Sequence, residues 1–337
     1  MDEILNTSTI QKPIRIGILG AASIVPMALT GPAHSVREVQ IAAVAARDPA
    51  RAQAFARKHN IPRVHPSYDA LLADPEIDAL YNPLPNSLHA EWTIRALRAG
   101  KHVLCEKPFA SNAQQAEQMA SAAADGGLVL SEAFAYRYHP LAARMQAIIA
   151  GGELGTIRHI EAQFCFLLPS PGNIRFRYDL AGGALMDSGC YPVSLIRYLA
   201  GAEPGVKHAQ ARLVSPQVDY RMSADLAFSD GRTAHMVCDM LSPALFRSFV
   251  SVQGEAGELQ VINPYHPHWF HWLTMRTRQG SRHERIPGEN IYVCQLRAFV
   301  KAIRGEAQLS TDPIDAIGNM RVIDSIYEKA GLKRRAA

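Results

Sequence analysis

The stretch IRIGILG, residues 14–20, decides the fold of this chain. It is a short apolar run that ends in a glycine, and a helical pattern follows it. A strand, a glycine turn and a helix in this order form the usual site for the phosphates of a dinucleotide. Open parallel sheets bind such ligands at the carboxyl ends of their strands. We therefore expect a dinucleotide to bind at the end of this first strand.

Up to about residue 135 the sequence alternates between short apolar runs and helical stretches. The expected strands cover residues 15–19, 40–45, 79–81, 102–105 and 128–131, and the expected helices cover residues 49–59, 67–73, 87–99 and 114–124. Asp48 has the place of an N-cap before Pro49. Short strands separated by helices indicate βαβ units and a parallel sheet. We expect a Rossmann-like, doubly wound domain over residues 14–135.

The second half of the chain has longer strand-like runs. They cover residues 157–166, 210–214, 224–228, 233–240, 248–254, 258–261 and 272–277, and helices are expected at 141–150, 185–199, 292–303 and 313–330. Consecutive strands without helices between them imply an antiparallel or mixed sheet. We expect an α+β domain with a large, mostly antiparallel open sheet over residues 136–337. Apolar residues on both faces of two strands predict a homodimer or homotetramer formed through this sheet.

Composition excludes several classes of protein. The net charge is only +4, and the one basic run, Lys333-Arg334-Arg335, is interpreted as a solvated terminus, so no nucleic-acid partner is expected. The five cysteines are scattered without CxxC spacing, which is typical of reduced thiols. Neither a signal-like start nor a run of about 18 apolar residues occurs. We expect a cytoplasmic protein without membrane contact.

The glycine turn gives a weak dinucleotide pattern when taken alone. Gly20 is present, but Ala22 and Val25 stand where the G-x-G-x-x-G fingerprint has its other glycines. The amides at the start of the next helix and the Ser23 hydroxyl are suited to a phosphate. An ordinary βα turn without ligand is the alternative.

Arg47 stands at the tip of the second expected strand, where an NAD enzyme would carry a ribose-binding acid. A guanidinium there can pair with the 2′-phosphate of NADP, so NADP is expected and NAD remains possible. The alternative is that Arg47 is a plain surface charge.

A second group of residues can handle a proton. Glu106-Lys107-Pro108 follows an apolar strand, and the proline holds Lys107 in an extended conformation. The sequence leaves open whether the Lys107–Pro108 bond is cis. Asp187 and Tyr191 are four residues apart and lie on one face of the helix expected at 185–199. Alternatively, these residues are a strand-end charge pair, a capping acid and a core tyrosine.

The chain resembles the Gfo/Idh/MocA oxidoreductases over nearly its whole length from residue 14. The matching blocks are residues 16–20, 44–48, 82–89, 100–108, 132–140, 183–191 and 319–324. The closest resemblance is to the dihydrodiol dehydrogenase and D-xylose dehydrogenase branch, which also has a tyrosine at the place of Tyr191. The resemblance implies that Lys107 and Tyr191 handle the proton while Asp187 lines the site. It also implies cofactor contacts from Gly20, Ala22, Ser23, Ile24, Arg47, Leu84, Asn86, His89, Glu106 and Glu132.

These features predict an NADP(H)-dependent oxidoreductase. It would transfer hydride between the nicotinamide and a secondary alcohol or carbonyl of a small sugar, polyol or cyclic trans-diol. A nucleotide-binding regulatory or sensor protein of the same fold is the alternative, and the presence of Lys107 favours the enzyme. The ammonium of Lys107 is expected to lower the pKa of the Tyr191 phenol.

Two further segments leave alternatives open. Residues 264–272 contain three histidines without the spacing of a metal site. The aromatic residues among them, Trp269, Phe270 and Trp272, are expected in the core, or else as a platform for a sugar or arene ring. Arg175, before the double glycine at 182–183, is expected either at the substrate or on the surface.

Overall fold

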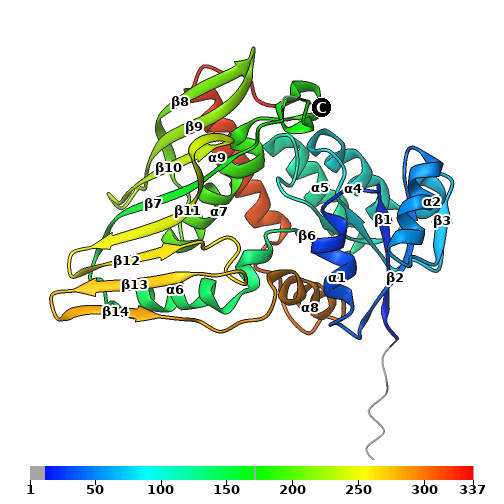
Figure 1. Ribbon diagram of the computed structural model, residues 1–337, viewed down its shortest axis with the longest axis horizontal. Coiled ribbons are helices and arrows are strands. Elements are labelled where there is room, and N and C mark those ends of the chain that lie inside the picture. Colours follow the sequence, from blue (N-terminus) through cyan, green and yellow to red (C-terminus); the bar gives the residue numbers. More distant parts are fainter. Residues whose placement is uncertain (1–11, 171, 337) are drawn as a thin grey trace, which may run out of the picture.

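A computed structural model of the protein describes residues 12–170 and 172–336. Within these residues the chain forms two sheets, and helices pack between and beside them (Figure 1). The first sheet has six parallel strands in the order β3-β2-β1-β4-β5-β6. The strands are β1 (Ile14–Leu19), β2 (Val39–Ala45), β3 (Arg63–His65), β4 (Ala79–Asn82), β5 (His102–Cys105) and β6 (Leu130–Glu132). The predicted Rossmann-like sheet is confirmed, although β3, three residues long, had not been expected.

Helices cover both faces of this sheet. They are the π-helical turn Pro26–Thr30 with α1 (Gly31–Ala33), then α2 (Pro49–Lys58), α3 (Tyr68–Leu72), α4 (His89–Arg98) and α5 (Ala113–Gly126). Asp48 caps α2 as expected, because its carboxylate accepts a hydrogen bond from the Ala50 amide at 2.9 Å. Successive residues of β1 point to opposite faces: Ile18 packs with the core around α1, and Leu19 with the core around α4 and α5.

The second sheet has eight strands in the order β14-β13-β12-β11-β7-β10-β9-β8. The strands are β7 (Ile157–Leu167), β8 (Gly205–Ser215), β9 (Val218–Ala227), β10 (Thr233–Asp239), β11 (Leu241–Gly254), β12 (Gly257–Ile262), β13 (Trp272–Thr277) and β14 (Gly280–Glu284). Only β7 and β10 pair in parallel, and the other neighbours are antiparallel. The expected large, mostly antiparallel sheet is therefore confirmed.

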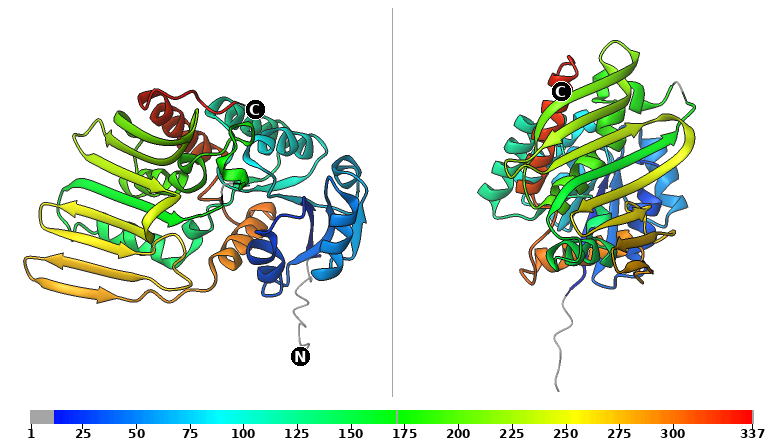
Figure 2. Two further views of the ribbon diagram at one scale, coloured as in Figure 1. Left: turned by 45° about the horizontal axis from the view of Figure 1, so that its top comes forward. Right: turned by 90° about the vertical axis from the view of Figure 1, so that its left-hand side faces the viewer.

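One face of this second sheet is covered and the other is open, as Figure 2 shows in its right-hand view. The covering helices are α6 (Pro140–Ala150), α7 (Cys190–Ala200) and α9 (Pro313–Lys329). The open face was expected to carry apolar residues in places, and it is mixed. Alternation along the strands places Glu161, Gln163, Glu258 and Gln260 on it. The strand register also places Phe249, Ile262 and Trp272 side by side on this face, with Ile262 and Trp272 49% and 60% exposed.

A helix near the end of the chain packs against the first sheet. The helix α8 (Ile291–Ile303) buries Ile291, Leu296 and Phe299 in the core that contains Ile18 of β1. The first domain is therefore completed by residues from the second half of the chain. The cleft between the two sheets receives side chains from both halves as a result.

The helix expected at residues 185–199 begins as a π-helical turn, Leu185–Gly189, which continues directly into α7. Two expectations about exposure are wrong. Trp269, Phe270 and Trp272 are 54–60% exposed rather than in the core. Arg335, assigned to a solvated basic run, is 1% exposed.

The cysteines form no disulfide among the described residues. Each of the five is a free thiol in the part of the chain that the structure describes. None of its described helices is long and apolar enough to cross a membrane.

Candidate active site

A cavity with a volume of about 310 Å³ lies at the carboxyl ends of the strands of the first sheet. The first domain lines it with the glycine turn, the segment after β4, and the segment after β5. The second domain contributes the π-helical turn and an aromatic wall. Of the predicted site residues, those that line the cavity are Ala22, Ser23, Ile24, Leu84, Asn86, His89, Glu106, Lys107, Asp187 and Tyr191. Gly20, Arg47 and Glu132 do not line it.

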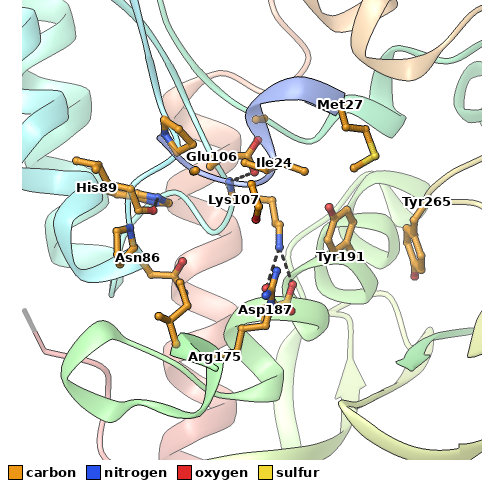
Figure 3. A pocket seen from close by; sticks show the side chains of 18 of the residues that line it. Ile24, Met27, Asn86, His89, Glu106, Lys107, Arg175, Asp187, Tyr191 and Tyr265 are labelled. Carbon is orange, nitrogen blue, oxygen red and sulfur yellow. Dashed lines mark hydrogen bonds and ion pairs between the residues drawn. The ribbon is translucent and has the colours of Figure 1, made fainter. Parts of the chain in front are cut away.

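Lys107 extends from the end of β5 toward the second domain, as Figure 3 shows. Its Nζ donates to the backbone oxygen of Asp187 at 2.9 Å and to the Asp187 carboxylate at 3.3 Å. The Lys107–Pro108 peptide bond, left open by the sequence, is cis. The ammonium of this first-domain residue is thus held at a defined point of the cavity by two contacts with Asp187 of the second domain.

Asp187 lies between two cations. Its second carboxylate oxygen is 2.8 Å from Nε of Arg175, so Lys107 and Arg175 share one acid (Figure 3). Burial alone would raise the pKa of Asp187, but the two cations outweigh it and lower this pKa below its ordinary value. Burial acts against the ammonium of Lys107 as well, yet Asp187 together with Cys190 and Glu106 outweighs it, and the pKa of Lys107 is raised. Both groups are charged at neutral pH, and the trio carries a net positive charge.

Tyr191 presents the face of its ring, rather than its hydroxyl, to Lys107. The Nζ lies 5.1 Å from the ring centroid, and the ring packs against Phe134, Phe164 and Tyr265 at centroid distances of 5.2–5.4 Å. Burial among these rings raises the pKa of Tyr191 well above 10. The expectation that Lys107 lowers the pKa of Tyr191 is therefore wrong. Tyr191 is a neutral phenol at physiological pH and so carries its proton.

Two glutamates stand behind Lys107. Glu106 lines the cavity and accepts a hydrogen bond from the Tyr81 hydroxyl at 2.6 Å, and burial raises its pKa. Glu132 is fully buried and accepts from the Phe109 amide at 2.9 Å. Burial raises the pKa of Glu132 well above its ordinary value. Its placement corrects the expected cofactor contact: Glu132 supports the backbone after Lys107 from inside the core.

The segment after β4 also contacts the backbone that follows Lys107. The two ring nitrogens of His89 lie 2.8 Å from the carbonyl oxygens of Pro108 and Leu84. Burial lowers the pKa of His89 to about 4, so the neutral ring donates to only one of them. Asn86 donates to the backbone oxygen of Ala181 at 3.0 Å and so links this segment to the second domain.

The glycine turn fits a phosphate-binding role in part. Gly20 has φ +93°, and a side chain there would press on Leu84. Ala22, Ser23 and Ile24 follow it at the cavity wall, where a helical segment begins. Val25, at the place of the third glycine, is fully buried and packs in the core beside β1. The turn therefore has a glycine at position 20, where the backbone needs a positive φ. At position 25, where the fingerprint has a glycine for close helix–strand packing, the apolar side chain of Val25 packs in the core instead.

Arg51 is a candidate that the sequence argument missed. It lies in the first turn of α2, and its guanidinium donates to the Ala21 oxygen in the glycine turn at 2.9 Å. The exposed Arg47 precedes it by four residues, at the tip of β2. The sequence does contain a signal for Arg51: it follows Arg47 by four residues, and the N-cap Asp48 places it in the first turn of the next helix. Two guanidinium groups therefore flank the edge where the adenosine end of a dinucleotide would lie.

The wall opposite the glycine turn is aromatic and was also missed. It is formed by Phe164 and Phe166 of β7, Tyr265 and His266 of the loop after β12, and Tyr292 of α8. The Tyr265 hydroxyl is buried and has no partner within the described residues. Burial lowers the pKa of His266 to about 4, so this ring is neutral. No group of three His, Cys, Asp or Glu side chains suited to a metal occurs among residues 12–170 and 172–336.

Comparison with known proteins gives one family for both domains. The model of the Gfo/Idh/MocA oxidoreductase family, with an NAD-binding Rossmann fold, matches residues 14–134, and that of the Gfo/Idh/MocA C-terminal domain matches residues 142–260. D-xylose 1-dehydrogenase (NADP(+)) 2 of Haloferax volcanii is 37% identical over 317 residues, which are 93% of this chain and 96% of the relative. Trans-1,2-dihydrobenzene-1,2-diol dehydrogenase of Sus scrofa is 35% identical over 230 residues, 67% of each chain.

Among solved structures, a 3-ketoreductase from Actinomadura kijaniata in complex with NADP and TDP-benzene is similar over 94% of this chain and 98% of its own. Its TM-score is 0.88 and its sequence identity 28%. The resemblance inferred from the motifs, including the branch, is confirmed.

The contacts of Lys107 predict the effect of Asp187→Asn. Removing the carboxylate removes the main influence that keeps the pKa of Lys107 high, while burial still acts to lower it, so this pKa is expected to fall. Carbon-13 NMR titration of reductively methylated lysines would measure it without any substrate. Asp179→Asn, which changes an exposed acid nearby, is the control. An unchanged or higher pKa for Lys107 in Asp187→Asn would contradict the electrostatic role of Asp187.

Proposed function

Because the chain belongs to the Gfo/Idh/MocA family of oxidoreductases, we propose that it transfers a hydride between NADP(H) and a secondary alcohol or carbonyl group. The proposed substrate is a small sugar, polyol or cyclic trans-diol. The observation that carries the proposal is the ammonium of Lys107, held by Asp187 beside Tyr191 in a cavity that begins at the glycine turn. The xylose and trans-diol dehydrogenases among the relatives support this substrate class.

The residues present fit a dinucleotide. The positive φ of Gly20 gives the strand–turn–helix its shape, and Ala22, Ser23 and Ile24 lie at the start of the helical segment. When bound, the nicotinamide would supply or accept the hydride. We assign dinucleotide binding to residues 14–135, aided by α8, and substrate binding and oligomerisation to residues 136–337.

Three side chains would handle the charge on the substrate oxygen. During carbonyl reduction negative charge develops on that oxygen, and the Lys107 ammonium stabilises it in a partly dry cavity. Tyr191, a neutral phenol, donates the proton. Asp187 holds the ammonium in place and keeps it protonated. In the oxidative direction the substrate proton would pass to Tyr191 only after the phenol has released its own proton to solvent, because a neutral phenol and an ammonium have no free site for it.

The aromatic wall supports a ring-shaped substrate with several hydroxyls. Phe164, Phe166 and Tyr265 offer apolar ring faces, while His266 and Asn86 offer polar atoms at the same cavity. A sensor would not need a lysine paired with a carboxylate and a buried tyrosine beside them in one cavity, so this arrangement favours turnover. Purified protein would be screened with sugars and trans-diols, with absorbance of the reduced nicotinamide as the readout.

The open face of the second sheet is the proposed subunit interface. It carries polar side chains around the apolar row Phe249, Ile262 and Trp272, so the contact would have an apolar centre with hydrogen bonds around it. Light scattering at micromolar concentration is expected to give two or four times the chain mass of 36.9 kDa. Phe249→Asp is expected to lower this mass, whereas Ile314→Asp, on α9, is not. A monomeric parent protein would contradict the interface.

Arg47 is expected to make the protein prefer NADP(H) over NAD(H). Arg47→Ala removes a charged donor for the 2′-phosphate, and such bonds contribute about 1.5–3 kcal/mol, or roughly 10- to 100-fold in the dissociation constant. The dissociation constant for NAD is expected to stay the same. Arg57→Ala, at the exposed end of α2, is the control. The preference would be refuted if the parent bound NAD as tightly as NADP.

Lys107 is expected to be the residue whose loss most reduces turnover. Lys107→Met keeps most of the side-chain volume and removes the charge, and general acid–base groups contribute about 10²–10⁴-fold, so kcat should fall at least about 100-fold. Cofactor binding should change little. Tyr191→Phe removes the donor but leaves the ammonium in place, so a smaller fall is expected. Lys58→Met, at an exposed position of α2, is the control. A Lys107→Met enzyme with near-normal kcat would end this mechanism.

A further inference from the structure

Arg335, far from Lys107 in sequence, lies at the centre of a buried hydrogen-bonded cluster. Its Nη2 is 2.8 Å from the Asp219 carboxylate, and its Nε donates to the Gly182 oxygen at 2.8 Å. Its guanidinium carbon lies 4.1 Å from the Tyr327 ring centroid, and its own backbone oxygen accepts from Asn112 at 2.8 Å. Both charged side chains of the Asp219–Arg335 pair are 0% exposed. In Figure 1 the red segment that carries Arg335 ends beside the green segment between β7 and α7.

The cluster holds the start of the π-helical turn that carries Asp187. The second oxygen of Asp219 accepts from the Leu185 amide at 2.7 Å, while its first accepts from the Tyr327 hydroxyl at 3.0 Å. Only glycine fits at position 183, where φ is +134° and a side chain would overlap with the Asp219 carboxylate. The turn therefore takes its position from Asp219 and Arg335.

Backbone hydrogen bonds connect this cluster to the catalytic groups. The Gly183 amide donates to the Arg175 oxygen at 2.8 Å, and the Asp187 amide donates to the Gly183 oxygen at 3.0 Å. Asp187 in turn binds the side chains of both Arg175 and Lys107. A continuous path of hydrogen bonds thus runs from Arg335 through Gly182, Gly183 and Asp187 to the ammonium of Lys107.

We propose that Arg335 is a positioning residue for the Lys107–Asp187 pair and acts through Asp219 and the double glycine. This inference rests on the proposed function, because it assigns a role in turnover. Arg335 does not line the cavity, so it touches neither substrate nor cofactor. Its planar fork donates to Asp219 and to the Gly182 oxygen at the same time, which a hydroxyl with its single donor could not do.

Arg335→Met is the principal variant, because it keeps a long apolar stem and removes both donated hydrogen bonds. Displacement of catalytic groups by about 1 Å costs roughly 100-fold in rate, so kcat is expected to fall about 10- to 100-fold. The dissociation constant for NADP is expected to stay unchanged. Arg334→Met is the matched control: this neighbouring side chain is 57% exposed and pairs with Glu328 at the surface, so its kcat should equal that of the parent.

A double variant separates positioning from a general structural effect. If Arg335 acts through Lys107, then Arg335→Met combined with Lys107→Met should have the same kcat as Lys107→Met alone. Losses that multiply in the double variant would show that Arg335 acts elsewhere, and would overturn the proposal. Lowered thermal stability with unchanged kcat would overturn it as well.

Hydrogen exchange of the peptide covering residues 183–191 supplies a readout that needs no turnover. The Leu185 and Asp187 amides are expected to exchange faster in Arg335→Met and at the parent rate in Arg334→Met. Unchanged exchange in Arg335→Met would overturn the proposal. If the parent reduces or oxidises none of the substrates tested while the exchange effect is present, the proposed function fails and the positioning of Asp187 stands.

Arg335→Lys decides the matter if Arg335→Met does not fold. It keeps a cation for Asp219 and loses the planar fork, so a fold with faster exchange at 183–191 and a partial loss of kcat is expected. A folded Arg335→Lys protein with the exchange and kcat of the parent would refute the role of the fork.

Discussion

The contact between Lys107 and Asp187 is the interaction on which the rest of the site depends. Lys107 comes from the end of β5 in the parallel sheet, and Asp187 comes from the π-helical turn before α7 in the second domain. The ammonium donates to both the backbone oxygen and the carboxylate of Asp187. The site therefore exists only when the two domains are packed together. Two neighbouring links secure the same junction: Asn86 donates to the Ala181 oxygen, and α8 returns from the second half to complete the first core.

Buried charges of this kind are costly, because both ions lose their hydration, and a well-packed apolar pair can be equally stable. At this site one carboxylate pairs with two cations, which reduces that cost. Asp187 accepts from both Lys107 and Arg175, so both of its oxygens are paired and one positive charge is left over. An excess of positive charge in a partly dry cavity is what a developing alkoxide requires. Burial disfavours a negative charge on the neighbouring acids, because it raises the pKa of Glu106 and, more strongly, that of Glu132.

The second buried ion pair, Asp219–Arg335, holds the backbone of the π-helical turn that carries Asp187. It lies behind the π-helical turn rather than in the cavity, and it is hydrogen-bonded to the Leu185 amide, the Tyr327 hydroxyl and the Gly182 oxygen. Breaking such a pair leaves a buried charge without its partner, which typically costs about 3–5 kcal/mol. The backbone that presents Asp187 is therefore fixed from behind by charges and from the front by Lys107. Flexible placement of Asp187 is excluded by contacts from three separate parts of the chain.

The sequence by itself determined the features that depend on neighbouring residues. The alternation of strands and helices, the cap at Asp48, the glycine turn at Gly20 and the placing of Lys107 at a strand end follow from local patterns, and the fold bears them out. Tertiary structure alone decided the features that depend on distant residues. Lys107 meets Asp187 across 80 positions, and Arg335 meets Gly182 across 153. Burial also depends on the tertiary structure, because the packed fold decides which groups surround each side chain. It raises the pKa of Tyr191, and it places the charged side chain of Arg335 in the core.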